Sequence, residues 1–260
     1  MLDAVRSSGV FASTAIIETT DIGPNCQVSD FAVIRKGVSL GEGVIIHPHV
    51  VINENVRIGD GVEVHAGSVI GKVPSGAHIL SHRPHCEMQL SIGEGCSIGP
   101  HAVVYYDVII GGYTLVGDGA SIREQCRIGA YSLISRCVTV NCNTRIGNRV
   151  KIMDNTHITG NAWIGDHVFI STGVSTTNDN FQTSKYDKEL MQGPCIMNFA
   201  RVAAGAILLP GVVIGEGAVV GAGCLVTRDV PAHSLVKGLP GRPTNLRESK
   251  IDPKLLEPSF

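Results

Sequence analysis

Aliphatic residues recur along this chain with a period of six. From Val10 to Ile70, from Ile92 to Ile170 and from Val202 to Val226, every sixth residue is Ile, Val or Leu. Between these steps, the position four residues after each aliphatic residue is Ala, Val, Ser, Thr or Cys. An amphipathic helix would repeat every 3.6 residues or so, and a long strand every two. The pattern therefore predicts a repeat protein in which each unit is one short strand and one turn.

Three such units are expected to close one triangular coil of 18 residues. The aliphatic and small residues of the coil point inward and stack on their equivalents above and below, whereas the residue after each aliphatic one points outward near a corner. Coils that hydrogen-bond at strand spacing rise about 4.8 Å each, so about ten coils give a prism roughly 48 Å long. The fold class expected is an all-β parallel β-helix.

The β-helix is expected to span residues 1–231, with loop insertions at 76–91 and 176–201 where the period lapses, followed by a tail at 232–260. Stepping by 18 residues separates three faces of the prism. The first face carries glycine at its outward position in coil after coil, from Gly23 to Gly165. The second carries, in order, Phe11, Ser29, His47, His65, Gly99, Gly117, Ser135, Met153 and Ser171. The third carries Ile17, Arg35, Asn53, Gly71, Tyr105, Arg123, Asn141 and Thr159.

The third face is expected to hold a ligand cleft. We expect the first insertion to leave from its far corner and the second from its near corner, so that two long loops frame polar side chains. Polar residues near this face are Asp118, Asp154 and Asn155 at the near corner, His157 on the strand, Glu124 at the far corner, and Asn178 and Asp179 at the start of the second loop. Polar outward residues also solvate ordinary surfaces, but Arg123 and Asn141 are stacked one coil apart.

Composition narrows the function classes. The net charge is −2, and 31 glycines accompany 6 Phe, 5 Tyr and 1 Trp, which suits a backbone that turns often around small and β-branched residues. Neither a basic field for nucleic acid nor an apolar run of membrane-spanning length is present in the sequence, and its start does not resemble a signal peptide. We expect a cytoplasmic protein without nucleic-acid or membrane partners.

The eight cysteines form no CxxC motif. Cys26, Cys96, Cys126 and Cys224 fall at small inward positions of the repeat, so we expect reduced thiols that pack as small hydrophobes, with neither disulfides nor a bound metal.

Two segments resemble a known family. They are Asn161 to Asp179, NAWIGDHVFISTGVSTTND, and Ile207 to Pro243, ILLPGVVIGEGAVVGAGCLVTRDVPAHSLVKGLPGRP. Together they resemble the hexapeptide-repeat N-acyltransferases that modify nucleotide-linked amino sugars. The resemblance implies a left-handed β-helix, a homotrimer with sites between subunits, and acyl-CoA as co-substrate along the C-terminal coils. It implies a dTDP- or UDP-linked amino-deoxy sugar as the second substrate, and leaves the acyl group, acetyl or another short one, open.

This chemistry assigns roles to particular residues. An acyl thioester is already activated, so the amine must be held against it and lose a proton. His157 is the candidate base, with Asp154 three residues before it as its partner, although a structural histidine and proton transfer to the thiolate leaving group stay open. Asp118, Glu124, Arg123, Asn141, Asn178, Asp179 and His82 are candidate substrate ligands. Arg228, Lys237 and Arg242 suit the CoA phosphates, and Gly205 and Gly223 lie in the coils expected to contact CoA.

Three other functions remain open at this point. SIREQCRIG at Ser121–Gly129 is similar to the middle coils of acyl-carrier-protein-dependent acyltransferases of the lipid A type. A γ-type carbonic anhydrase on the same fold needs three histidines converging on zinc from adjacent subunits. His78, His82, His85 and Cys86 do cluster, but within the first insertion rather than on coil strands. The last alternative, a purely structural β-helix, would not need two loops that frame one polar face.

Overall fold

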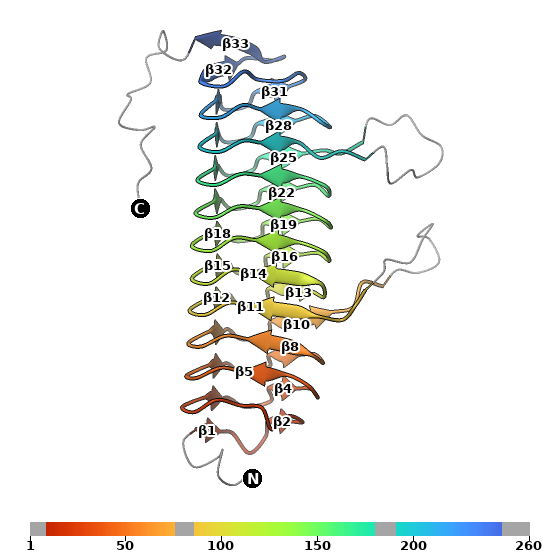
Figure 1. The fold of residues 1–260 in the computed structure, drawn as a ribbon, viewed down its shortest axis with the longest axis vertical. Coiled ribbons are helices and arrows are strands. Elements are labelled where there is room, and N and C mark those ends of the chain that lie inside the picture. Colours follow the sequence, from red (N-terminus) through yellow and green to blue (C-terminus); the bar gives the residue numbers. More distant parts are fainter. Residues whose placement is uncertain (1–8, 76–85, 180–190, 246–260) are drawn as a thin grey trace.

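The computed structural model describes residues 9–75, 86–179 and 191–245, and every regular element within these ranges is a β-strand. The strands form a parallel β-solenoid of about 11 turns with three parallel sheets, drawn as a prism in Figure 1. The prediction of an all-β parallel β-helix is thus confirmed, with about one coil more than expected.

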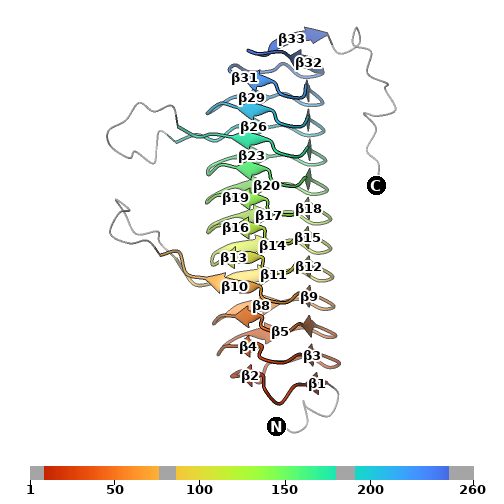
Figure 2. The ribbon, with the colours of Figure 1, turned by 180° about the vertical axis from the view of Figure 1, so that it is seen from behind.

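The strands of successive coils stack into three sheets, one on each face of the prism (Figures 1 and 2). Within the described ranges, sheet A, the second face of the sequence analysis, contains 13 strands: β1 (Val10–Phe11), β3 (Gln27–Val28), β6 (Ile45–Ile46), β9 (Glu63–Val64), β12 (Ser97–Ile98), β15 (Leu115–Val116), β18 (Leu133–Ile134), β21 (Lys151–Ile152), β24 (Phe169–Ile170), β27 (Arg201–Val202), β30 (Val219–Val220), β32 (Ser234–Lys237) and β33 (Arg242–Asn245).

Sheet B, the third face, contains 11 described strands: β2 (Ile16–Ile17), β4 (Val33–Ile34), β7 (Val51–Ile52), β10 (Val69–Lys72), β13 (Val103–Tyr105), β16 (Ser121–Ile122), β19 (Thr139–Val140), β22 (His157–Ile158), β25 (Ser175–Thr176), β28 (Ile207–Leu208) and β31 (Leu225–Val226). Sheet C, the first face, contains nine: β5 (Ser39–Leu40), β8 (Val56–Ile58), β11 (Leu90–Ile92), β14 (Val108–Ile110), β17 (Arg127–Ile128), β20 (Arg145–Ile146), β23 (Trp163–Ile164), β26 (Cys195–Ile196) and β29 (Val213–Ile214).

The core consists of the residues that the period of six selected. From the second coil onward, the aliphatic positions on the strands are buried, and so are the small positions between them, such as Cys26, Ala32 and Val38. All eight cysteines are free thiols, and burial raises the pKa of Cys126 to about 12. The inward thiols therefore stay protonated and pack as small hydrophobes, as the sequence indicated.

The glycine column on sheet C has a packing cause. A Cβ atom on Gly129 would lie 2.5 Å from the backbone of Gly147 in the next coil, and the other glycines of the column meet similar contacts. Successive coils approach so closely at this corner that a side chain cannot be inserted. These glycines therefore shape the prism and give no indication of a ligand.

The register of the first coil differs from the prediction by one residue. Phe11 pairs with Val28 and Ile17 with Ile34, so Phe11 and Ile17 point toward the core, whereas Val10 and Ile16 are 71% and 52% exposed. Ile22 is again in the expected register, opposite Leu40. The step from Ile17 to Ile22 is five residues instead of six. The periodicity hid this shortening because Val10 and Ile16 each have an apolar neighbour, Phe11 and Ile17. Ile17 is therefore not an outward residue of the third face.

The second insertion begins later and ends earlier than predicted. β25 continues sheet B with Thr176 buried in the aliphatic position, and β26 resumes sheet C at Cys195–Ile196. Thr176 interrupts the run of Ile, Val and Leu, which hid this strand from the periodicity. Both insertions consequently leave from the corner between sheets B and C, as their described bases show in Figures 1 and 2. The expectation that they frame sheet B from opposite corners was wrong.

Two further features depart from the regular repeat. Tyr106 is buried at the corner where the first insertion leaves, and its hydroxyl donates a hydrogen bond to the Glu54 carbonyl 2.8 Å away. Within the segment expected to be a tail, β32 extends sheet A with Val236 in the core, and β33 pairs with it in antiparallel fashion. The coil is thus closed at its C-terminal end by a hairpin.

Candidate functional site on sheet B

His157 lies in the middle of sheet B with its imidazole on the outer surface. It opens β22 and is aligned with Thr139 of the preceding coil and Ser175 of the next one. The ring is half-buried, and burial lowers the pKa of His157 below its ordinary value. The neutral imidazole is therefore the form present at neutral pH, as a general base requires.

A hydroxyl fixes one ring nitrogen of His157. The Thr139 Oγ1 lies 2.7 Å from His157 Nδ1, and Nε2 makes no hydrogen bond to any residue within the described ranges. When Nδ1 carries the proton and donates it to Thr139, Nε2 presents a lone pair to solvent. His157 Nε2 is thereby oriented as a proton acceptor on the outer surface of sheet B.

Asp154 does not pair with His157, contrary to the sequence hypothesis. Its carboxylate accepts hydrogen bonds from the Ser135 hydroxyl and from the Arg136 guanidinium at 2.8 Å, and these bonds lower the pKa of Asp154. The side chain turns back toward the preceding coil because that coil supplies a hydroxyl and a cation at the same corner. Three residues of sequence separation place Asp154 before the turn and His157 after it.

Arg123 and Glu124 form a fixed ion pair at the corner between sheets B and C. Two guanidinium nitrogens of Arg123 donate to the two carboxylate oxygens of Glu124 at 3.1 and 2.8 Å, and the residue Glu124 is only 3% exposed. The Arg123 guanidinium also lies 5.7 Å from the centre of the Tyr105 ring. The Lys72 ammonium lies 4.9 Å from the same ring centre. A bidentate pair of this kind holds two side chains in one geometry, and Lys72 adds positive charge at the corner.

Amide side chains continue this corner toward the second insertion. Asn141 lies one coil after Arg123 and is partly exposed, as predicted. Asn143 donates to Asn161 across one coil at 2.8 Å, and Asn178 donates to the Gly160 carbonyl at 3.3 Å. The corner thus presents a row of hydrogen-bonding groups between the bases of the two insertions.

The remaining predicted substrate ligands are not all gathered here. Asp118 is exposed at the opposite corner of sheet B, where it follows β15. Asp179 is exposed immediately after Asn178. His82 lies outside the described residues, as do His78 and His85.

The same outward column that carries His157 becomes apolar toward the C-terminus. Ser175 is followed in the ladder by Ile207, which is 42% exposed, and then by Leu225. Strands within a sheet lie about 4.8 Å apart, so Ile207 is about 10 Å from His157 along the sheet. This strip escaped prediction from the sequence because its residues come before, and not after, each aliphatic position.

The candidate CoA ligands lie in the last coils but at different corners. Lys237 and Arg242 are exposed and directly opposite each other in the terminal hairpin, and Arg228 is exposed after β31. Gly205 and Gly223 are stacked at the corner between sheets A and B, where a Cβ would meet open space. Their positive φ angles of 67° and 63° account for glycine at these turns.

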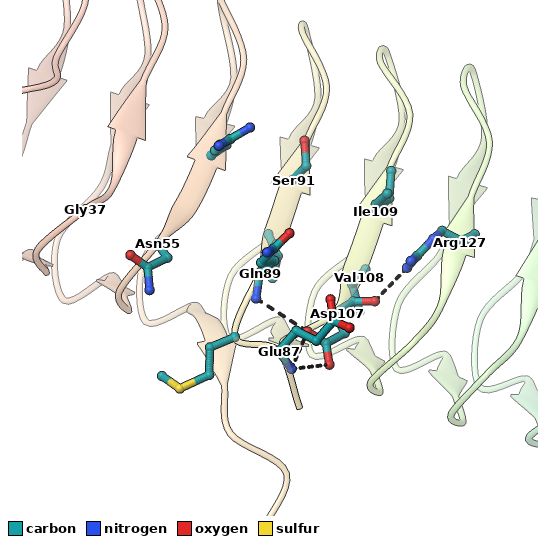
Figure 3. Close-up of a pocket in the computed structure, with 12 residues that line it drawn as sticks. Gly37, Asn55, Glu87, Gln89, Ser91, Asp107, Val108, Ile109 and Arg127 are labelled. Carbon is teal, nitrogen blue, oxygen red and sulfur yellow. Dashed lines mark hydrogen bonds between the residues drawn. The ribbon is translucent and has the colours of Figure 1, made fainter. Parts of the chain in front are cut away.

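Sheet C carries a hollow that the sequence did not predict. It measures about 510 Å³ and is lined by Gly37, Asn55, Arg57, Glu87, Met88, Gln89, Leu90, Ser91, Asp107, Val108, Ile109 and Arg127. Figure 3 shows Asp107 at its edge, accepting hydrogen bonds from the backbone of Glu87 and Gln89. The Arg127 guanidinium donates to the Asp107 carbonyl at 2.7 Å. The returning end of the first insertion forms one wall, which is why the repeat pattern could not reveal it.

A second hollow lies further along the same sheet. It measures about 280 Å³ and is lined by Arg127, Arg145, Ile146, Gly147, Trp163, Ile164, Gly165, Asp166 and Asn198.

Within the described parts of the chain, no helix is long and apolar enough to span a bilayer.

Comparison with known proteins identifies the repeat. The family profile described as bacterial transferase hexapeptide (six repeats) matches residues 19–54, 37–72 and 143–178. A serine acetyltransferase of Bacillus pumilus (strain SAFR-032) is 37% identical over 89 residues, 34% of this chain and 38% of the relative. A serine acetyltransferase of Synechococcus elongatus is 36% identical over 92 residues, 35% of each protein. The chain spans little more than a third of the length of these curated relatives.

Solved structures align over longer stretches at lower identity. An acyltransferase of UDP-N-acetylglucosamine from Francisella novicida aligns with 16% identity and a TM-score of 0.46, covering 96% of this chain and 75% of that one. A hexapeptide-repeat acetyltransferase of Vibrio cholerae, solved with acetyl-CoA, aligns with 22% identity and a TM-score of 0.36, covering 52% and 68%. The matched profile and the observed coil of six-residue units show that the chain contains the hexapeptide repeat found in bacterial transferases.

Proposed function

We propose that this protein is an acyl-CoA-dependent N-acyltransferase that acts on the amine of a nucleotide-linked amino-deoxy sugar, carried by UDP or dTDP. The observation that carries the proposal is the half-buried His157, whose Nε2 is unpartnered among the described residues between a polar and an apolar stretch of sheet B. One reactive group, one polar side and one apolar side suit the joining of two unlike substrates.

The reaction needs one proton acceptor. The substrate amine attacks the thioester carbonyl, the C–N bond forms, and the C–S bond breaks as the thiolate leaves. His157 Nε2 takes the proton lost by the amine and can pass it to the departing sulfur, so the imidazole returns to its neutral form. Burial favours this neutral form before the reaction, and Thr139 holds the ring in place.

The two stretches of sheet B are assigned to the two substrates. The pantetheine arm lies along Ile207 and Leu225 toward the C-terminal coils, where Lys237, Arg242 and Arg228 supply cations for the CoA phosphates. The amino sugar lies toward Thr139, Asn141 and the Arg123–Glu124 pair, whose donors and acceptors match hydroxyl and phosphate groups. Asn178 borders this end at the base of the second insertion.

The matched relatives support acyl transfer more than they support the sugar. Both curated relatives are named serine acetyltransferases, so the stretch that they share with this chain occurs in proteins that transfer an acetyl group. The sugar-nucleotide acceptor rests instead on the resemblance of Asn161–Asp179 and Ile207–Pro243 to N-acyltransferases of that class. Serine is therefore the informative competing acceptor.

Free thiol release from acyl-CoA tests the proposed activity. Acetyl-CoA and longer short-chain acyl-CoAs are incubated with UDP- and dTDP-linked amino sugars, with L-serine, and with the matching sugars that carry hydroxyl in place of amine. Thiol release that depends on the amino sugar supports the proposal. Thiol release with L-serine alone contradicts the proposed acceptor and assigns serine instead. If no acyl-CoA releases thiol with any acceptor, the acyl-CoA donor is wrong, and acyl-carrier-protein donors are tested next.

We also propose that the protein is a homotrimer. Exposed aromatic side chains form a ridge at the corner between sheets C and A: Tyr113 stacks on Tyr131 with ring centres 5.2 Å apart, and His167 stacks on Phe199 at 4.9 Å. Tyr113 and Tyr131 are 51% and 50% exposed. An apolar ridge of this kind is typical of a surface that another subunit covers.

Sedimentation equilibrium at micromolar concentration should give three times the 27.4 kDa chain mass. Tyr131→Asn should shift the protein toward monomer, because it removes the centre of the ridge while keeping a residue that tolerates the positive φ of 57°. Phe31→Asn, an exposed aromatic with φ of 59° at a different corner, is the matched control and should stay trimeric. A wild type that sediments as a monomer contradicts the trimer.

A further inference from the structure

A group of metal-binding side chains lies on sheet A, on the side of the prism away from the two insertions (Figure 2). His47 follows β6 and His65 follows β9, one coil later in the ladder, while Glu63 opens β9. The 18-residue period therefore stacks two imidazoles and places a carboxylate beside them. None of these residues belongs to the proposed acyl-transfer site.

The three side chains converge through their polar atoms. His47 Nε2 lies 2.7 Å from Glu63 Oε1, and His65 Nε2 lies 3.8 Å from Glu63 Oε2. The two imidazole rings are stacked with centres 4.8 Å apart and planes 13° from parallel. One ligand atom from each residue can be chosen so that all three lie within 4.8 Å of one another.

These separations are close to those of a coordination sphere. Zinc binds histidine nitrogen and carboxylate oxygen at about 2.0–2.2 Å, which puts the ligands of a tetrahedral ion roughly 3.3–3.6 Å apart. Modest side-chain rotations would suffice to reach such spacing, because all three side chains are partly exposed. Because the three side chains are partly exposed, water can reach the cluster as a further ligand.

A fourth group borders the cluster. The Ser97 hydroxyl, which opens β12 in the ladder after Glu63, lies 3.4 Å from His65 Nε2. It can hydrogen-bond a metal-bound water, in the manner of the outer groups that orient ligands around protein-bound ions. Two neutral imidazoles and one carboxylate, with water completing the sphere, are a donor set that prefers borderline divalent ions over calcium or magnesium.

We propose that His47, Glu63 and His65 bind a divalent first-row transition-metal ion of the zinc type. The ion links two adjacent coils through their outer surface and stabilises the folded state, since it binds a geometry that the unfolded chain lacks. Sequence analysis predicted no bound metal because these ligands form no short motif and are brought together only by the 18-residue repeat. The proposal is independent of the acyl-transfer reaction.

Binding is measured with Zn²⁺ by calorimetry and with Co²⁺ by visible absorption, on protein whose affinity tag has been removed and which has been stripped by chelator. We expect one ion per chain, a d–d absorption band typical of nitrogen and oxygen ligands, and a melting temperature that rises with Zn²⁺ concentration. Loss of one ligand should weaken metal binding by at least about tenfold, because loss of a group that only hydrogen-bonds a metal ligand already lowers affinity by that factor.

His65→Ala and Glu63→Gln remove ligands from the cluster, and circular dichroism verifies that each variant is folded. His49→Asn is the matched control, because it deletes a nearby histidine that stacks on Phe31 and keeps a residue suited to its φ of 61°. Weaker binding in both ligand variants with wild-type binding in the control supports the proposal. The proposal is overturned if all four proteins bind the ion equally well, or if the wild type binds it more weakly than millimolar.

Discussion

Ile128→Asp should destabilise the β-helix severely. Ile128 is buried in β17, between Ile110 of the preceding coil and Ile146 of the next. The substitution places a carboxylate in a continuous aliphatic column that excludes water and offers it no polar partner. Burying an unpaired charge belongs to the mechanisms that cost on the order of 4 kcal/mol or more.

The adjacent column of the same sheet supplies the control. Ile109 in β14 is 46% exposed and alternates with the buried Ile110. Ile109→Asp should therefore change the free energy of unfolding by less than about 1 kcal/mol. Urea unfolding of both variants measures the difference. Equal stability of the two variants would refute the assigned inward and outward positions of sheet C.

His157→Ala should lower kcat for acyl transfer by about 10²–10⁴-fold while leaving the affinity for acyl-CoA unchanged, because it removes the proton acceptor and none of the apolar strip. Thr139→Val should have a smaller effect in the same direction, since it removes the hydroxyl that holds Nδ1. Asp154→Asn should leave kcat close to wild type, because that carboxylate bonds Ser135 and Arg136 instead of the imidazole.

The pH dependence of kcat/KM distinguishes a base from a structural histidine. Burial lowers the pKa of His157, so the neutral imidazole persists to pH values below the ordinary histidine pKa of about 6.5. The acid limb of the profile should therefore lie below that value in the wild type and disappear in His157→Ala. A variant with unchanged kcat and an unchanged acid limb would assign proton transfer to the leaving thiolate instead.

The repeat itself could be predicted because its signal is local and redundant. Each buried Ile or Val supports the same assignment of the coil, so sheet membership followed from counting alone. The prediction failed where a single residue broke the rule: the shortened first coil between Ile17 and Ile22, and Thr176 in an aliphatic position. Because the strand with Thr176 was missed, the second insertion was assigned to the wrong corner of sheet B, and the cleft was expected between two corners instead of at one.

Side-chain partners were harder to predict because a repeat brings together residues 18 positions apart. Asp154 is closer in sequence to His157, yet its carboxylate meets Arg136 on the preceding coil. The pairing of Thr139 with His157, and of His47 with His65, follows the same period. The hollow on sheet C depends on the path of the chain as it returns from the first insertion, which periodicity does not encode.

The proposed location of acyl transfer, on sheet B around His157, is tested most directly by a crystal structure of the protein with CoA. We predict the thiol sulfur beside His157 Nε2, with the pantetheine arm along Ile207 and Leu225 and the phosphates toward the C-terminal coils. A CoA molecule whose thiol lies in the hollow of sheet C beside Arg57 and Arg127, away from His157, would contradict this location.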